Sequence, residues 1–235
     1  MSSVDISPHG VLYSPILTHR RSEELLEILV LRHGQSVADI ENRYEGRADF
    51  PLTELGREQA QRAARWIVAN YLPTVIVASP LKRASETARI VGAACGLAVT
   101  FDEGLMEFNS GAIAGLPYEE ADRLYPLPEG GRLPHERVPG GESLLEFRFR
   151  AEEVWSRLVS EYEAAGRLLV VAHGGMISML FRAFARLPVG IEVWLHTGDT
   201  GLHLWRVAGA ERSILFANRL GHLDAPGEPS TPEAP

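Results

Sequence analysis

Two histidines of the chain each follow directly on an apolar run and are themselves followed by glycine. His33 stands after Arg32 at the end of "LEILVLR", and His173 stands after "RLLVVA". A third apolar run, "TVIVAS", is followed four residues later by Arg83. Planar guanidinium groups match phosphate oxygens bidentately, and a neutral imidazole is a competent nucleophile near pH 7. These residues indicate a phosphate or similar oxyanion site, where one histidine attacks phosphorus and the other, protonated, neutralises charge on the oxygens.

The three apolar runs must lie side by side for these residues to meet. Such runs, at 26–32, 74–79 and 167–174, are typical of strands buried on both faces of a sheet. Helical patterns alternate with them, and "GLHLWRV" and "RSILFANRL" add a late edge hairpin. This order predicts an α/β fold: a three-layer α/β/α sandwich with a mostly parallel central sheet. Because ligands of such sheets bind at the carboxyl ends of the strands, we expect the histidines and arginines at one edge.

Local signals indicate where the helices begin and end. An N-cap, a capping box and a terminal glycine are expected at Thr53, at Ser143 with Glu146, and at Gly96. Residues 126–141 are rich in Pro and Gly and predict a long loop. Its Arg132, His135 and Arg137 either reach over the site or lie in solvent, and the sequence leaves both open.

Length and charge limit the classes of partner. The chain has 235 residues, the size of one α/β domain. Its net charge of −8 argues against nucleic acid or an anionic membrane as a partner, since both repel an acidic surface. Neither a membrane-spanning apolar stretch nor a secretory signal is present, so we expect a cytoplasmic protein. We divide the chain into an N-terminal extension (1–26), one domain (27–222) and a disordered Pro-rich tail (223–235).

Six blocks of the sequence carry a resemblance to a known family. They are "LRHGQS", "ENRYEGRADFPLTELGREQA", "ASPLKRASETA", "GLMEFNSGAIAGL", "PGGES" and "VVAHGG". In their order and spacing, over residues 28 to 218, they resemble the histidine phosphatase superfamily, which also contains the cofactor-dependent phosphoglycerate mutases. The resemblance implies that the domain 27–222 has a phosphoglycerate mutase-like fold.

The resemblance also implies roles for single residues. His33 would be the nucleophile that becomes a phosphohistidine, and Glu107, in "LMEF", would be the proton donor to the leaving group. Arg32, Arg83 and His173 would hold the phosphoryl group. Further positions expected beside the phosphate are Gly174, Asp39, Glu45 and Gly46. No metal and no other cofactor is required.

Asp39 and Glu45 depart from the family pattern, because relatives commonly carry uncharged side chains at these positions. Two carboxylates beside a phosphate repel it: at an effective dielectric near 20, one like-charge pair at 4 Å costs about 4 kcal/mol. The acids could be turned away and paired with Arg43 or Arg47. One of them could be protonated, or they could face a cationic part of the substrate such as an amine. The sequence favours the first of these accounts and leaves the others open.

Hydrolysis is favoured over phosphoryl transfer between substrate positions. Similar mutases carry a Tyr after the glutamate, where this chain has Ser110, and an Arg pair in the following insertion, which the corresponding loop "FNSGAIAGLPYEEADRLYP" lacks. We therefore predict a phosphomonoesterase that acts on a small phosphorylated metabolite. The alternatives are a phosphoglycerate mutase-type transferase and a weakly active, phosphate-binding regulatory protein on the same fold. A homodimer is left open.

Overall fold

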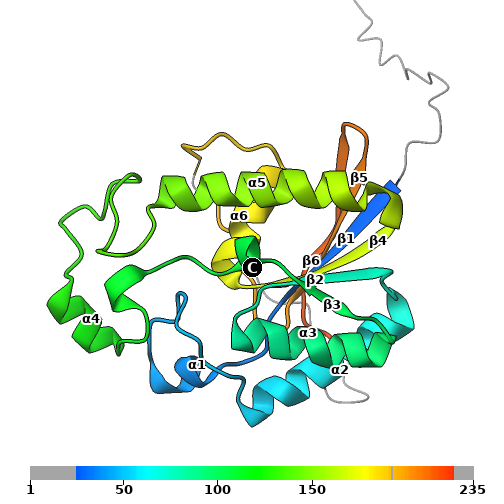
Figure 1. The fold of residues 1–235 in the computed structure, drawn as a ribbon, viewed down its shortest axis with the longest axis horizontal. Coiled ribbons are helices and arrows are strands. Elements are labelled where there is room, and N and C mark those ends of the chain that lie inside the picture. Colours follow the sequence, from blue (N-terminus) through cyan, green and yellow to red (C-terminus); the bar gives the residue numbers. More distant parts are fainter. Residues whose placement is uncertain (1–24, 192, 225–235) are drawn as a thin grey trace, which may run out of the picture.

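The computed structural model describes residues 25–191 and 193–224 of the chain. It has an α/β architecture in which a six-stranded sheet lies between two layers of helices (Figure 1). The elements, in chain order, are β1 (Leu25–Arg32), α1 (Val37–Glu41), α2 (Glu54–Asn70), β2 (Val75–Ala78), α3 (Lys82–Cys95), β3 (Val99–Phe101), α4 (Tyr118–Leu124), α5 (Leu144–Tyr162), β4 (Arg167–Ala172), α6 (Gly174–Phe184), β5 (Leu202–Ala208) and β6 (Glu211–Arg219), with short 3₁₀ turns at Glu103–Leu105, Gly111–Ile113 and Glu163–Ala165.

The strand order of the sheet is β3-β2-β4-β1-β5-β6. The first four strands are parallel, and β5 and β6 form an antiparallel hairpin that extends the sheet beside β1. The predicted, mostly parallel sheet and the late hairpin are both confirmed. Since β2, β4 and β1 are direct neighbours, the three apolar runs end at the same edge.

Each face of the sheet is covered by one pair of helices, α5 and α6 on one side and α2 and α3 on the other (Figure 1). Successive side chains of a strand point to opposite faces. Accordingly Ile28 and Val30 pack into the core under α5 and α6, while Leu29 and Leu31 pack against α2 and α3. Burial on both faces explains why the runs are apolar without interruption, and the three-layer sandwich is confirmed.

The predicted helix signals are found where they were expected. The Thr53 hydroxyl accepts a hydrogen bond from the Gly56 N–H, and Ser143 forms a capping box with Glu146. Gly96 ends α3 with a φ of 68°, a conformation that glycine adopts without strain. The sequence analysis missed α1, because five residues are too few for a periodic pattern.

The domain boundaries of the sequence analysis are only partly covered by the structure. β1 begins at Leu25, two residues before the predicted boundary at 27, because Leu26 already pairs with Val207 of β5 and is buried. The rest of the predicted extension and the predicted tail from residue 225 lie outside the described residues. Within residues 25–191 and 193–224, no helix is long and apolar enough to cross a membrane.

Acid is expected to destabilise the fold through His203, which is fully buried on β5. Its Nδ1 accepts a hydrogen bond from the Asn218 N–H at 3.1 Å, which holds the ring neutral, and burial lowers its pKa to about 4. Between about pH 6.5 and 4, His203 is protonated in the unfolded state, where its pKa is near 6.5, but stays neutral in the folded state. Stability should therefore fall with pH in this window by about 1.4 kcal/mol per unit for each such histidine.

Urea unfolding at pH 7, 6 and 5 measures this slope. His203→Gln should lower it by about 1.4 kcal/mol per pH unit, although the variant itself is less stable. His196, which is exposed, supplies the matched control: His196→Gln should leave the slope unchanged. Equal slopes in the wild type and His203→Gln would contradict the assignment.

Candidate active site

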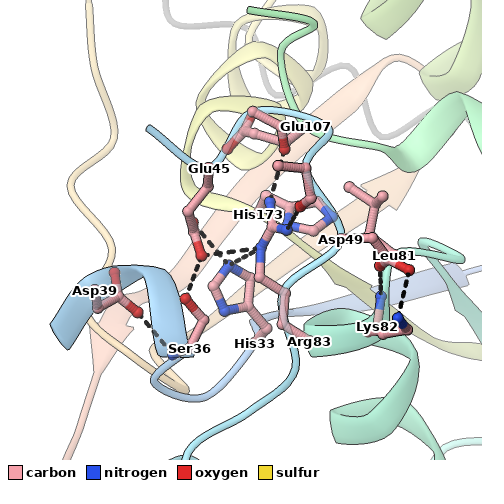
Figure 2. A network of polar contacts seen from close by, with 12 residues as sticks. His33, Ser36, Asp39, Glu45, Asp49, Leu81, Lys82, Arg83, Glu107 and His173 are labelled. Carbon is pink, nitrogen blue, oxygen red and sulfur yellow. Dashed lines mark hydrogen bonds and ion pairs between the residues drawn. The ribbon is translucent and has the colours of Figure 1, made fainter. Parts of the chain in front are cut away.

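The residues singled out by the sequence meet at the carboxyl ends of β1 and β4. Arg32 is the last residue of β1 and pairs in register with Ala172, the last residue of β4. His33 and His173 come directly after these strands, and their ring centroids are 5.1 Å apart. Arg83 reaches the same place from the first turn of α3, as Figure 2 shows. The predicted meeting of two histidines and two arginines at one edge is thus observed.

His33 is held so that its Nε2 atom carries the lone pair. Its Nδ1 lies 2.8 Å from the Gly34 carbonyl oxygen, to which it donates, and its Nε2 accepts from Arg83 Nε at 3.2 Å. The side chain is 1% exposed. Burial first, and then the charges of Arg83 and Arg32, hold the pKa of His33 well below its usual value. The ring is therefore neutral near pH 7, as a nucleophile must be.

Arg83 is fully buried, and backbone oxygens fix the plane of its guanidinium group. Its Nη1 donates to the Ala48 carbonyl at 3.0 Å and its Nη2 to the Gly46 carbonyl at 2.9 Å. Gly46 has a φ of 48°, and a Cβ there would lie 2.5 Å from the Ser110 Oγ. Gly46, expected beside the phosphate, is thus observed to position Arg83 through its carbonyl oxygen.

His173 differs in charge from the sequence-based expectation. Its Nε2 lies 2.8 Å from the Ser79 hydroxyl oxygen. Its Nδ1 is buried and has no hydrogen-bond partner in the described part of the chain. Burial, followed by the charge of Arg83, lowers its pKa well below the usual value, so this ring too is neutral. A bound phosphoryl group would reverse the local field and favour the protonated form that the sequence analysis expected.

Arg32 lies at the rim of the site with 22% of its side chain exposed. Its Nη1 donates to the Thr197 carbonyl at 2.7 Å, and its Nη2 lies 3.4 Å from Asp199 Oδ1. Its Nε is buried and has no hydrogen-bond partner among the described residues. Thr197 and Asp199 were not found by the sequence analysis, because the segment between α6 and β5 has no periodic pattern.

The carboxyl group of Glu107 is fixed at the N-terminus of α6. Its Oε2 accepts from the Gly175 N–H at 2.9 Å, and its Oε1 accepts from Met176 at 3.1 Å and Phe108 at 2.7 Å. A Cβ on residue 175 would lie 2.5 Å from Glu107 Oε1, so the close approach requires glycine there. Arg150 of α5, also missed from the sequence, donates to the Glu107 carbonyl and supports the loop.

The glycines after the two histidines have different surroundings. A Cβ on Gly34 would lie 2.3 Å from the Gly56 carbonyl oxygen, and the Gly34 N–H donates to the Thr87 hydroxyl. Gly34 therefore lets its loop pack against α2 and does not make room for a ligand, although a glycine directly after His33 suggests that role. Gly174 has open space around it: the atom nearest to where its Cβ would lie is Arg32 Nε, at 3.9 Å.

The two acids that depart from the family pattern are not paired with Arg43 or Arg47, so that expectation is wrong. Arg43 binds Glu41 at 2.6 Å, and the Arg47 guanidinium lies 4.0 Å from Glu142. Asp39 turns toward α1 and accepts from the Ser36 N–H, whereas Glu45 points into the site toward Arg83 and His33 (Figure 2). Burial is the main cause that raises the pKa of Glu45.

The arginines of the long loop contact that loop and α5. Arg132 donates to the Tyr125 carbonyl, and Arg137 binds Glu146 at 2.7 Å. These contacts lie outside the cluster around His33. In the described parts of the chain, no three His, Cys, Asp or Glu side chains are grouped so that they could hold a metal ion.

The family of the chain follows from its whole sequence. A family profile described as "Histidine phosphatase superfamily (branch 1)" matches residues 28–219. The chain belongs to this superfamily. The glucosyl-3-phosphoglycerate phosphatase of Mycolicibacterium vanbaalenii is 34% identical over 217 residues, which are 86% of this chain and 87% of that protein. The phosphoglycerate mutase-like protein 4 of Arabidopsis thaliana is 32% identical over 206 residues, 86% and 88% of the two chains.

Solved structures share the fold of this superfamily member. The native structure of a mycobacterial glucosyl-3-phosphoglycerate phosphatase matches it with a TM-score of 0.71 at 29% identity, over 83% of this chain and 99% of that one. The resemblance stated from the six sequence blocks and the phosphoglycerate mutase-like fold are both confirmed.

Proposed function

We propose that the protein is a phosphomonoesterase that hydrolyses a small organic phosphate through a phosphohistidine on His33. The neutral Nε2 of His33, directed by Arg83 and surrounded by Arg32 and His173, is the observation that carries the proposal. Nε2 attacks phosphorus and the ester P–O bond breaks, while Glu107 gives a proton to the leaving oxygen. Water then attacks the phosphorus of the phosphohistidine and Glu107 takes a proton from that water. The P–N bond breaks, its electron pair returns to His33 Nε2, and inorganic phosphate leaves.

Two other functions are less well supported. A mutase needs side chains that bind a phosphoglycerate. Ser110, which is buried, stands where similar mutases carry a Tyr. A weakly active regulatory protein would not need a proton donor, yet the Glu107 carboxyl is held in place by three backbone N–H groups. Hydrolysis uses all of these residues. A cytoplasmic location and a homodimer stay predictions.

The rim of the site predicts which esters are preferred. Asp199 pairs with Arg32 at this rim, and Asp39 acts electrostatically on Asp199. A further carboxylate on the substrate is expected to be repelled. Glycerol 3-phosphate should therefore have a kcat/KM about tenfold higher than 3-phosphoglycerate, which corresponds to about 1.4 kcal/mol.

A phosphate-release screen of metabolite esters at several pH values tests the proposal. Release from at least one ester is expected. Absence of release from every ester would contradict a phosphatase, and conversion of 3-phosphoglycerate into its 2-isomer without release would favour the mutase. An equal or higher kcat/KM for 3-phosphoglycerate than for glycerol 3-phosphate would contradict the proposed role of the acidic rim.

A further inference from the structure

The carboxyl group of Glu45 lies beside the atom of His33 that would carry the phosphoryl group. Its Oε1 lies 3.2 Å from Arg83 Nε, and its Oε2 lies 3.8 Å from His33 Nε2. Arg83 Nε donates its single hydrogen to His33 Nε2 and also lies within ion-pair distance of the Glu45 carboxyl group. A phosphoryl group bound to His33 Nε2 would displace this acceptor and lie beside the Glu45 carboxylate, which shares the charge of Arg83.

The surroundings of Glu45 combine both signs of charge. Arg83 of α3 and Arg32 of β1 favour its ionised form, and so does the hydrogen bond from the Ser36 hydroxyl. Asp39 of α1 opposes it, and the neutral rings of His33 and, in α4, Tyr118 add no charge. The side chain is 18% exposed, and its burial outweighs the arginines and raises its pKa. Burial thus already disfavours the ionised carboxyl group before any ligand arrives.

A phosphoryl group adds up to two negative charges beside this carboxyl. It also takes the charge of Arg83, which until then stabilised the ionised Glu45. Both changes favour the protonated carboxyl. A protonated carboxyl carries an O–H donor, which can bind a phosphoryl oxygen where a carboxylate could only repel it.

We propose that Glu45 is a positioning residue that gives up its ion pair with Arg83, takes one proton from solution, and donates a hydrogen bond to the phosphoryl group when the ester binds. The proton returns to solution when phosphate leaves. This inference rests on the proposed phosphatase function. It states that the ester reacts while the Glu45 carboxyl group is protonated. Its consequence is that phosphate binds with uptake of a proton and weakens as the pH rises.

The test is binding of inorganic phosphate to the full chain, measured by titration calorimetry at pH 7 to 9 in two buffers of different ionisation enthalpy. The wild type should take up about one proton more per bound phosphate than Glu45→Gln, whose amide N–H supplies the donor at every pH. The dissociation constant of the wild type should rise about tenfold per pH unit relative to that of Glu45→Gln. At pH 8 the variant should bind phosphate at least about tenfold more tightly.

Glu41→Gln is the matched control, because it removes an exposed carboxylate of the same segment that pairs with Arg43 and is not among the charges that act on Glu45. It should keep the proton uptake of the wild type. Equal uptake in the wild type and Glu45→Gln, or loss of uptake in Glu41→Gln, would overturn the inference. So would zero uptake by the wild type, a result that does not depend on how well any variant folds. Because phosphate binding needs no turnover, these outcomes are distinct from a failure to hydrolyse esters.

Discussion

His33→Ala is expected to lower kcat by at least about 10⁴-fold, the loss typical of removing an enzymatic nucleophile. The reason is local: His33 Nε2 carries an unprotonated lone pair that Arg83 Nε directs, and Arg32 lies at the same strand end. Arg83 and His173 would still bind phosphate, but no covalent intermediate could form. Release of inorganic phosphate from the best ester of the screen measures the effect.

Acid-labile phosphate bound to the protein is the second readout. A short reaction with radiolabelled ester, quenched in base, should leave label on the wild type and none on His33→Ala. His196→Ala, which changes an exposed histidine, should keep both label and turnover. Turnover or label in His33→Ala, with circular dichroism showing a folded protein, would mean that another residue is the nucleophile.

The ends of the strands could be predicted because their pattern is local. An apolar run that ends in Arg32 and His33 predicts a buried strand with functional residues at its end. The parallel order of β1 and β4 follows from the alternation of strands and helices. From these two facts His33 and His173 were expected to meet, and they do.

The conformation of the segment between α1 and α2 could not be predicted in the same way. Asn42 adopts a φ of 52° and Gly46 a φ of 48°, and these two left-handed residues turn Glu45 inward while Asp39 stays with α1. Such turns are stabilised by contacts distant in sequence, here the Gly46 carbonyl with Arg83. The unusual acid at Glu45 is visible in the sequence, but its partner is Arg83 and not the expected Arg43 or Arg47.

The role of Gly34 was also misread for a reason of packing. Its neighbours in sequence suggest a ligand, whereas its neighbour in space is the backbone of Gly56, which would itself clash with Gln35 if it carried a Cβ. Two glycines 22 positions apart let the loop after β1 approach α2. Their proximity is visible only in the structure. The glycine that lies close to a reactive group is Gly175, beside the Glu107 carboxyl group.

Glu107→Gln is expected to lower kcat by about 10²- to 10⁴-fold for alkyl phosphates, the usual contribution of a general acid. An alkoxide leaving group needs a proton as the P–O bond breaks, and glutamine has none to give at useful acidity. Aryl phosphates such as p-nitrophenyl phosphate leave as stable phenolates, so their kcat should fall much less. The ratio of the two losses, measured by phosphate release, is the quantity of interest.

That ratio separates proton donation from a structural role. Glutamine keeps one oxygen for the Gly175 or Met176 N–H but loses the second acceptor, which could shift the start of α6 and, with it, His173. A displaced His173 would weaken the grip on the phosphoryl group equally for every leaving group. Equal losses for alkyl and aryl esters would therefore mean that Glu107 acts by holding α6, whereas a loss confined to alkyl esters can only come from the missing proton.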